Sequence, residues 1–389
     1  MKINKFFLNL TFLKVISQLT LMSPVFYYFF TNNVALVGKY MVYVPFVSIL
    51  IELIAPEWVK FAIFKRVLIR DHVITYLIGF VIVISLLILV AMCLKIERLY
   101  VVLLFSSLGA NILSQHLVDL VTLLERIDGN KEIFQNYLAK KLLIVDIIFP
   151  LIITALLWGK NSDVAFYLGG GVGAVIVTGV IVAYVRLLPN AKPNSANLTE
   201  SALSIYPYLF AKRIDSQAFR LALSITIPAP ILGALFPIVI ISRGVNVVGN
   251  FVHYFYIDRI ERVFTILSKN YALISSLVLL PVVLAYLIKL MLTHLGYSSI
   301  NVAVAAAFLS INFSAIIRLF SRGIKVKYGR NNDVTISLFI MALFKFCIAY
   351  LLSGVNYNLM FLFLIYVLCE AYLDCRQAKN KLEKRSKEV

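Results

Sequence analysis

The chain has 389 residues, of which 61% are apolar and 14% are charged, and its formal net charge is +18. A soluble globular protein has about half of its residues apolar and about a quarter charged, so this composition excludes an ordinary water-soluble or disordered protein. The basic residues lie in short gaps between long apolar runs and not on one soluble face, which argues against nucleic-acid binding and for a membrane protein.

Apolar runs long enough to cross a lipid bilayer follow one another along the chain. A transmembrane helix needs about 20 predominantly apolar residues. The sequence therefore predicts an all-α polytopic membrane protein with about twelve transmembrane helices in two six-helix bundles around a central cavity. The expected helices cover residues 6–30, 34–58, 73–94, 99–123, 142–159, 164–187, 206–226, 229–257, 270–292, 299–318, 334–354 and 358–374. Pro228 and Pro230 supply the only break between the seventh and the eighth.

The distribution of basic residues predicts how these helices are oriented. If both termini are cytoplasmic, the inner segments hold 26 Lys and Arg residues and the outer loops hold 3. Cytoplasmic loops of membrane proteins carry the excess of Lys and Arg, so this asymmetry favours twelve spans with both termini inside. Residues 318–330, with five Lys and Arg, count as one of the inner segments.

A polar stretch in mid-chain, Pro189–Ser201, divides the sequence into two halves. We expect an N-terminal six-helix bundle over 1–188, a cytoplasmic linker over 189–203, a C-terminal six-helix bundle over 204–376 and a basic cytoplasmic tail over 377–389. Each half contains, in its first span, a basic residue followed at +3 and +4 by Ser-Gln, at Lys14 and at Arg213. Three matched positions can arise by chance, but their placement favours a six-plus-six repeat.

Cationic side chains at membrane depth are the candidate binding groups. Such charges are costly there and usually face a cavity or a partner. Arg213 and Arg220 fall on one stripe of the seventh span, whereas Lys212 and Asp215 lie on another side and can neutralise each other. We expect a water-filled cavity that binds an anionic substrate, lined by Lys14, Lys39, Arg213, Arg220 and Arg243.

Each of these charges also has a structural interpretation, in which it pairs with an opposite charge on a neighbouring span. Lys39 with Glu52, or Lys345 with Glu370, would be such pairs. Among the acids, Glu52 and Asp215 are weak candidates for coupling transport to an ion. The structural interpretation is favoured for both, because each has a cation nearby in the sequence.

The sequence contains no arrangement that indicates an enzyme or a cofactor. No nucleophile–base pair, nucleotide loop or metal-ligand spacing rises above background. The glycine run Gly169–Gly173 lies inside an expected span and lacks the Lys-Ser/Thr that follows a phosphate loop. We therefore expect a protein that is not an enzyme, with no cofactor and no metal.

The architecture and a few short stretches together resemble one family. These stretches are Ser23-Pro24 with Gly38, Tyr206-Pro207-Tyr208 through Arg213-Ile214-Asp215, and Gly233-Ala234. With twelve spans in two halves and basic residues in spans one, two, seven and eight, the chain resembles the Wzx-type polysaccharide repeat-unit flippases. These O-antigen or capsule translocases belong to the multidrug/oligosaccharidyl-lipid/polysaccharide exporter superfamily.

The resemblance implies a function as well as a fold. It implies a multi-pass protein of the bacterial inner membrane that moves undecaprenyl-diphosphate-linked oligosaccharide between leaflets by alternating access. Membrane lipid is the surrounding partner, and a polysaccharide polymerase and chain-length proteins are candidate partners. Two alternatives remain open: a multidrug or ion antiporter of the same superfamily, which should favour acids in its cavity, and a membrane polysaccharide polymerase, which should carry a large outer loop.

Overall fold

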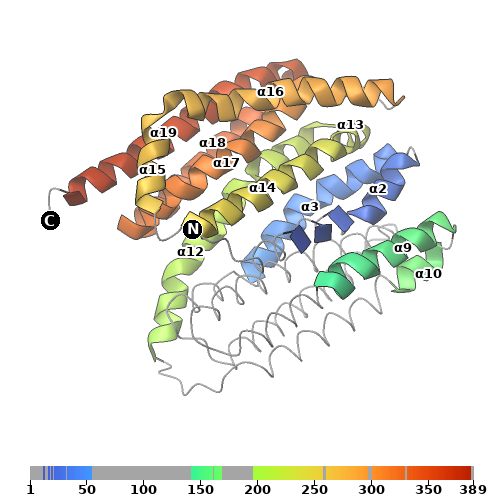
Figure 1. Cartoon of the computed structure of the whole chain (residues 1–389), viewed down its shortest axis with the longest axis horizontal. Coiled ribbons are helices and arrows are strands. Elements are labelled where there is room, and N and C mark those ends of the chain that lie inside the picture. Colours follow the sequence, from blue (N-terminus) through green and yellow to red (C-terminus); the bar gives the residue numbers. More distant parts are fainter. Residues whose placement is uncertain are drawn as a thin grey trace. The chain divides into compact units, whose positions relative to one another are not determined.

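The structure is a computed structural model, and the residues that it describes are helical wherever they form a regular element (Figure 1). The described residues are 12–13, 16–17, 19–20, 22–31, 33–54, 142–160, 162–168, 196–256, 260–296, 300–328 and 331–386. The expected spans at 73–94 and 99–123 lie outside these ranges, as does nearly all of the span at 164–187.

The chain divides into two compact units. The first unit comprises Met1–Asn33 and Phe46–Phe210, and the second comprises Val34–Pro45 and Ala211–Val389. Two helices therefore contribute to both units. Helix α3 (Val34–Ile54) gives its first half to the second unit, and helix α12 (Ala196–Thr226) gives its second half to that unit.

The described part of the first unit consists of a few short helices. They are α2 (Ser23–Phe30), the π-helical segment η2 (Leu142–Ile148), α9 (Phe149–Trp158) and α10 (Ser162–Tyr167). Helix α2 packs on α9, where Ser23 Oγ and Thr154 Oγ1 are hydrogen-bonded at 2.7 Å. The ring of Tyr27 lies edge-on to Trp158, with 5.2 Å between the centroids.

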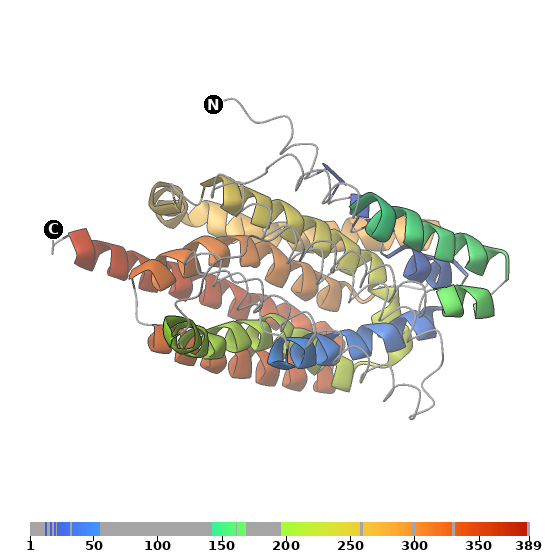
Figure 2. The same cartoon turned by 90° about the horizontal axis from the view of Figure 1, so that it is seen from below.

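The second unit is a bundle of long helices (Figures 1 and 2). After α12 the chain forms α13 (Ala229–Ala234), α14 (Phe236–Tyr256), α15 (Ile260–Lys269), α16 (Tyr271–His294), α17 (Val302–Tyr328), α18 (Asn331–Val355), the 3₁₀ turn η5 (Tyr357–Leu359) and α19 (Met360–Ser386). Figure 1 shows the short helix α15 running across the direction of its neighbours α14 and α16.

Helix α17 lies at the centre of this bundle. It packs against α14, α15, α16, α18 and α19. Its first turns read Val-Ala-Val-Ala-Ala-Ala-Phe, and residues 302–308 are all buried. Small side chains let neighbouring backbones approach closely, and a helix that is apolar all round belongs in an interior. The sequence of α17 thus accounts for its central place.

Four described helices are long and apolar enough to cross a membrane. They cover Ile274–His294, Val302–Lys325, Asp333–Val355 and Tyr357–Glu383. Helices α16 and α18, which contain the first and third of these spans, expose large apolar side chains along their length. Such side chains suit contact with lipid chains better than contact with water. The described structure is therefore all-α, as expected, and it indicates a membrane protein. The number of twelve spans stays a prediction.

The expected helix boundary at the prolines is confirmed, whereas two helices extend beyond their expected ends into segments that contain charged residues. As predicted, α12 ends at Thr226, directly before Pro228 and Pro230. However, α12 begins at Ala196, inside the expected linker 189–203, and α19 continues to Ser386, through most of the expected tail 377–389. Both extensions consist largely of good helix formers such as Ala, Leu, Glu and Lys, which allow a helix to continue past an apolar run.

Two glycines allow the start of α3 to cross α13 at backbone distance. A Cβ atom added to Gly38 would overlap the carbonyl of Ala229, and one added to Gly233 would overlap the carbonyl of Val34. The contact is reciprocal, since each glycine faces the residue four positions before the other. All four residues belong to the second unit.

Candidate functional site

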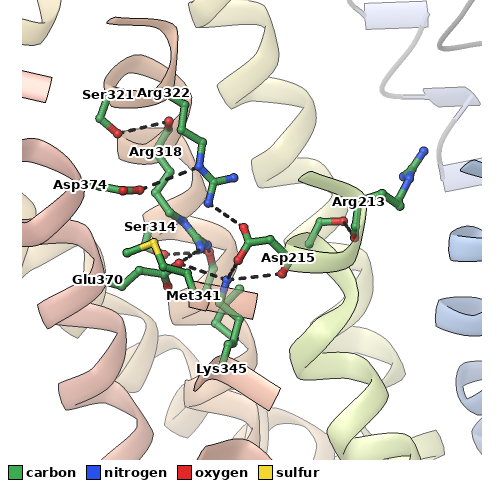
Figure 3. A network of polar contacts seen from close by, with 12 residues as sticks. Arg213, Asp215, Ser314, Arg318, Ser321, Arg322, Met341, Lys345, Glu370 and Asp374 are labelled. Atoms are coloured by element: carbon green, nitrogen blue, oxygen red, sulfur yellow. Dashed lines mark hydrogen bonds and ion pairs between the residues drawn. The ribbon is translucent and has the colours of Figure 1, made fainter. Parts of the chain in front are cut away.

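A buried network of charged side chains lies inside the second unit and joins four of its helices (Figure 3). Helices α12 and α19 contribute three acids, and α17 and α18 contribute four cations. The members are Asp215 on α12, Arg318, Arg322 and Lys325 on α17, Lys345 on α18, and Glu370 and Asp374 on α19. Charges at such depth persist when they are paired and hydrogen-bonded.

The contacts between α17 and α19 follow from the spacing of the charges along each helix. Arg318, Arg322 and Lys325 stand at i, i+4 and i+7 on α17, so they form one stripe. Glu370 and Asp374 stand at i and i+4 on α19. Arg318 Nη1 donates to Glu370 Oε1 at 2.8 Å. Lys325 Nζ donates to Asp374 Oδ1, and Arg322 Nε lies 3.9 Å from Asp374 Oδ2.

Asp215 connects α12 to the network through both of its carboxylate oxygens. Arg322 Nη2 donates to Oδ2 at 2.6 Å, and Lys345 Nζ donates to Oδ1. Lys345 Nζ also lies 3.1 Å from Glu370 Oε1 and 3.3 Å from the backbone oxygen of Asp215. Only 1% of the Lys345 side chain is exposed. The ammonium group of Lys345 therefore bridges two carboxylates in a fully enclosed position.

Two of the expected pairings can be judged from these contacts. The pairing of Lys345 with Glu370 is confirmed. Asp215 is paired, as the structural interpretation holds, but its two oxygens contact Arg322 and Lys345 from α17 and α18, whereas Lys212 of its own helix was the expected partner. The reason is geometric, because buried Asp215 points into the bundle where α17 and α18 pass it.

Arg213 and Arg220 lie on α12 outside this network. Figure 3 shows Arg213 pointing away from the charged cluster, on the other side of α12 from Asp215. Both arginines are half-buried. The guanidinium carbon of Arg220 stands 5.2 Å from the ring centroid of Phe308, a cation–π contact that holds the side chain against α17.

The remaining predicted site residues are described only in part. Lys39 lies on α3, is exposed, and follows Gly38 in the close crossing with α13. Glu52 and Arg243 belong to α3 and α14, but their side chains lie outside the described part of the structure. Lys14 lies outside the described residues altogether.

Four members of the network were not predicted as site residues from the sequence. Arg318, Arg322 and Lys325 were assigned to an inner segment at 318–330, but α17 continues to Tyr328. It buries Arg318 and Lys325 and leaves the paired Arg322 side chain 14% exposed. Asp374, the fourth, ends the last expected span. The available signal was the matched spacing: cations at i, i+4 and i+7 on one helix, and acids at i and i+4 on another.

No protein-family model, curated protein or solved structure matches this chain. Among the described residues, no group of three or more His, Cys, Asp or Glu side chains could hold a metal ion. The described helices are long and apolar enough to indicate a helical membrane protein, and they enclose a mixed-charge network among the C-terminal helices.

Proposed function

We propose that this protein is a flippase that moves undecaprenyl-diphosphate-linked oligosaccharide repeat units across the bacterial inner membrane by alternating access. The observation that carries the proposal is the division of charge on α12. Asp215 faces into the bundle and is paired there with cations of α17 and α18, whereas Arg213 points to the other side of the helix. Arg220, seven residues further, belongs to the same stripe as Arg213.

A stripe of arginines suits the head group of such a substrate. Two guanidinium groups can each form paired hydrogen bonds with phosphate oxygens, and these bonds are stronger away from bulk water. The polyprenyl chain of the substrate stays in lipid while the charged, sugar-bearing head group crosses. We propose that Lys14, Lys39 and Arg243 complete the cationic lining of this path.

The reciprocal glycine crossing supports the proposed six-plus-six architecture. Val34 and Gly38 are four residues apart, as are Ala229 and Gly233, and each glycine faces the other segment's first residue. Gly38 meets Ala229 while Gly233 meets Val34, and such a reciprocal contact is what a two-fold relation between two similar segments produces. In this architecture both termini are cytoplasmic and the spans number twelve.

An antiporter of the same superfamily is the second candidate, because the network contains three buried carboxylates. An antiporter that exports cations needs an acid open to its substrate. In the network, Asp215, Glu370 and Asp374 each contact a cation of α17. This pairing favours the flippase, because the network offers a cationic substrate no acid that lacks a partner.

The proposal is tested by complementing a strain that lacks its own repeat-unit flippase. Arg213→Ala and Arg220→Ala should each reduce surface polysaccharide severely, because each lost charge-assisted contact removes about 1.5–3 kcal/mol of binding. Lys at these positions should restore export in part if charge alone matters, and fail if paired hydrogen bonds are needed. The matched control is Arg262→Ala, which removes an exposed arginine of α15.

Membrane levels decide how these results are interpreted. If both variants reach the membrane like the parent and export like the parent, the cationic-path proposal is wrong. If they are missing from the membrane while Arg262→Ala is present, the two arginines hold the fold together, and the proposal fails at this site.

A further inference from the structure

Gln217 of α12 has a buried amide oxygen without a hydrogen-bond partner among the described residues. Its side chain is only 7% exposed. Four other buried polar atoms in the described part of the chain also lack a partner, and all four belong to the charged network. The ion pairs of that network do not involve Gln217. A buried acceptor without a partner destabilises a protein, so it calls for an explanation such as a bound ligand or water.

The hydrogen bonds beside Gln217 fix which end of its amide is the oxygen. Ser216 Oγ donates its single proton to the backbone oxygen of Arg213 at 2.7 Å. The end of the Gln217 amide that lies 3.4 Å from Ser216 Oγ must then be the donating Nε2 group. The other end, Oε1, is therefore an acceptor, and only a group that donates a proton can satisfy it.

Gln217 belongs to the arginine stripe of α12. It lies four residues after Arg213 and three before Arg220, a spacing that puts the three side chains on one face of the helix. At about 1.5 Å per residue, the Cα atom of Gln217 stands about 6 Å along the helix axis from that of Arg213 and about 4.5 Å from that of Arg220. A neutral acceptor therefore lies between the two cations.

A sugar joined to a diphosphate offers the groups that this face of α12 can bind. An ionised diphosphate has acceptor oxygens and no donor, so it suits the guanidinium groups but cannot satisfy Gln217 Oε1. The sugar next to the diphosphate carries hydroxyl groups, and an amino sugar also carries an amide N–H. Each of these groups can donate to the amide oxygen.

We propose that Gln217 is a specificity-determining residue, whose Oε1 accepts a hydrogen bond from the first sugar of the substrate while Arg213 and Arg220 bind the diphosphate. This role rests on the proposed flippase function. A carrier lipid that lacks the sugar leaves the buried oxygen without a donor, and sites of this kind reject the analogue that lacks the donor group. The contact therefore distinguishes the loaded carrier lipid from empty polyprenyl diphosphate, which the arginines alone do not.

Binding of two lipids to the purified full-length protein in lipid nanodiscs tests this role. The probes are polyprenyl diphosphate that carries one N-acetylhexosamine and polyprenyl diphosphate without a sugar. Gln217→Met keeps the length of the side chain and removes the acceptor. It should weaken binding of the sugar-bearing lipid about three- to tenfold and leave the affinity for the sugar-free lipid unchanged. Ser224→Ala, on the same stripe, is the matched control, because the hydroxyl of Ser224 already donates to the backbone oxygen of Leu221 at 2.8 Å.

The stability of the variants without ligand separates a binding role from a structural one. An apolar side chain in place of an acceptor that has no partner should leave the midpoint of heat-induced aggregation unchanged or raise it. Gln217→Leu provides a second apolar side chain if the methionine variant is not recovered. Lower midpoints than the parent, or loss of the folded protein, in both variants would show that Gln217 holds the fold together, and would overturn the proposed role.

The binding results also separate this role from the flippase proposal. Parental affinity of Gln217→Met for both lipids would mean that water alone satisfies the oxygen, and equal losses for both lipids would mean that it does not recognise the sugar. Either result overturns the role of Gln217 and leaves the flippase proposal standing. A parent that binds neither lipid would refute the flippase proposal, and the role of Gln217 with it.

Discussion

Gly38 and Gly233 occupy positions where a backbone carbonyl fills the space in which a side chain would begin. Such a contact brings α3 and α13 closer together than any other residue would allow. The charged residues show the same dependence on immediate surroundings: Asp215 is tolerated because two cations of other helices reach its oxygens. At this scale, what a residue does depends on neighbours that are distant in the sequence.

The glycine crossing should be intolerant of even one methyl group. Gly38→Ala and Gly233→Ala each force two backbones apart. We expect each to lower the free energy of unfolding by about 1–3 kcal/mol or more, the usual cost of overpacking. The midpoint of heat-induced aggregation of detergent-purified protein measures this effect. Gly354→Ala is the control, because its new Cβ would meet Thr226 Cγ2 at an ordinary 3.9 Å. Equal midpoints for all three variants would contradict the crossing.

Removing the carboxylate of Asp215 should destabilise the second unit strongly. Asp215→Asn removes a counter-charge from Arg322 and from the buried Lys345, and breaking such a buried pair costs about 3–5 kcal/mol. Glu383→Gln breaks the exposed pair with Lys379, which spans 3.7 Å, and should change stability by about 1 kcal/mol or less. The same aggregation midpoints measure the difference. An Asp215→Asn protein as stable as the Glu383→Gln protein would show that the network pairs do not stabilise the fold.

At the scale of helices, the sequence correctly predicted features that depend on one helix alone, such as the end of α12. Helix α12 ends at Thr226 because two prolines follow closely and Pro228 adopts an extended conformation, whereas the single Pro207 is accommodated within the helix. The far ends of α17 and α19 were not predicted, because a search for apolar runs stops at charged residues. Arg318 and Lys325 are buried and Arg322 is largely covered in spite of their charge, since the matching acids stand on other helices. Pairing between helices is tertiary information that one apolar run does not contain.

The pairing of α17 with α19 can be tested by replacing both partners of one ion pair. Arg318→Met and Glu370→Met should each destabilise the protein, because each leaves a buried charge without a partner. The double variant should recover much of the loss, since two apolar side chains of similar length replace the pair. A double variant with the summed loss of the two single variants would contradict direct pairing.

At the scale of the whole molecule, the predicted cytoplasmic location of both termini rests on the asymmetry of Lys and Arg residues between the two sides of the membrane. Three of the five Lys and Arg residues counted at 318–330 are paired with acids in the network, so they do not contribute to that asymmetry. The excess of basic residues in the other inner segments is unchanged by this correction. The orientation of the termini therefore remains a prediction of the sequence.

Single cysteines can test this orientation in intact cells and in inverted vesicles. In a variant without the native cysteines, a cysteine at Lys160, in the turn after α9, should react with an impermeant maleimide from the periplasm. A cysteine at Asn197, in the first turn of α12, should react from the cytoplasm. Reaction of both positions from the same side would refute the twelve-span topology.

The central claim, that the arginine stripe of α12 carries an anionic lipid-linked sugar across the membrane, is tested most directly with purified protein in liposomes. The substrate is a fluorescent polyprenyl-diphosphate oligosaccharide, and an impermeant quencher reports its arrival in the outer leaflet. We predict rapid translocation by the parent and by Arg262→Ala, and rates reduced about tenfold or more by Arg213→Ala and by Arg220→Ala. Translocation by both arginine variants at the parental rate, or by the parent no faster than in protein-free liposomes, would contradict the claim.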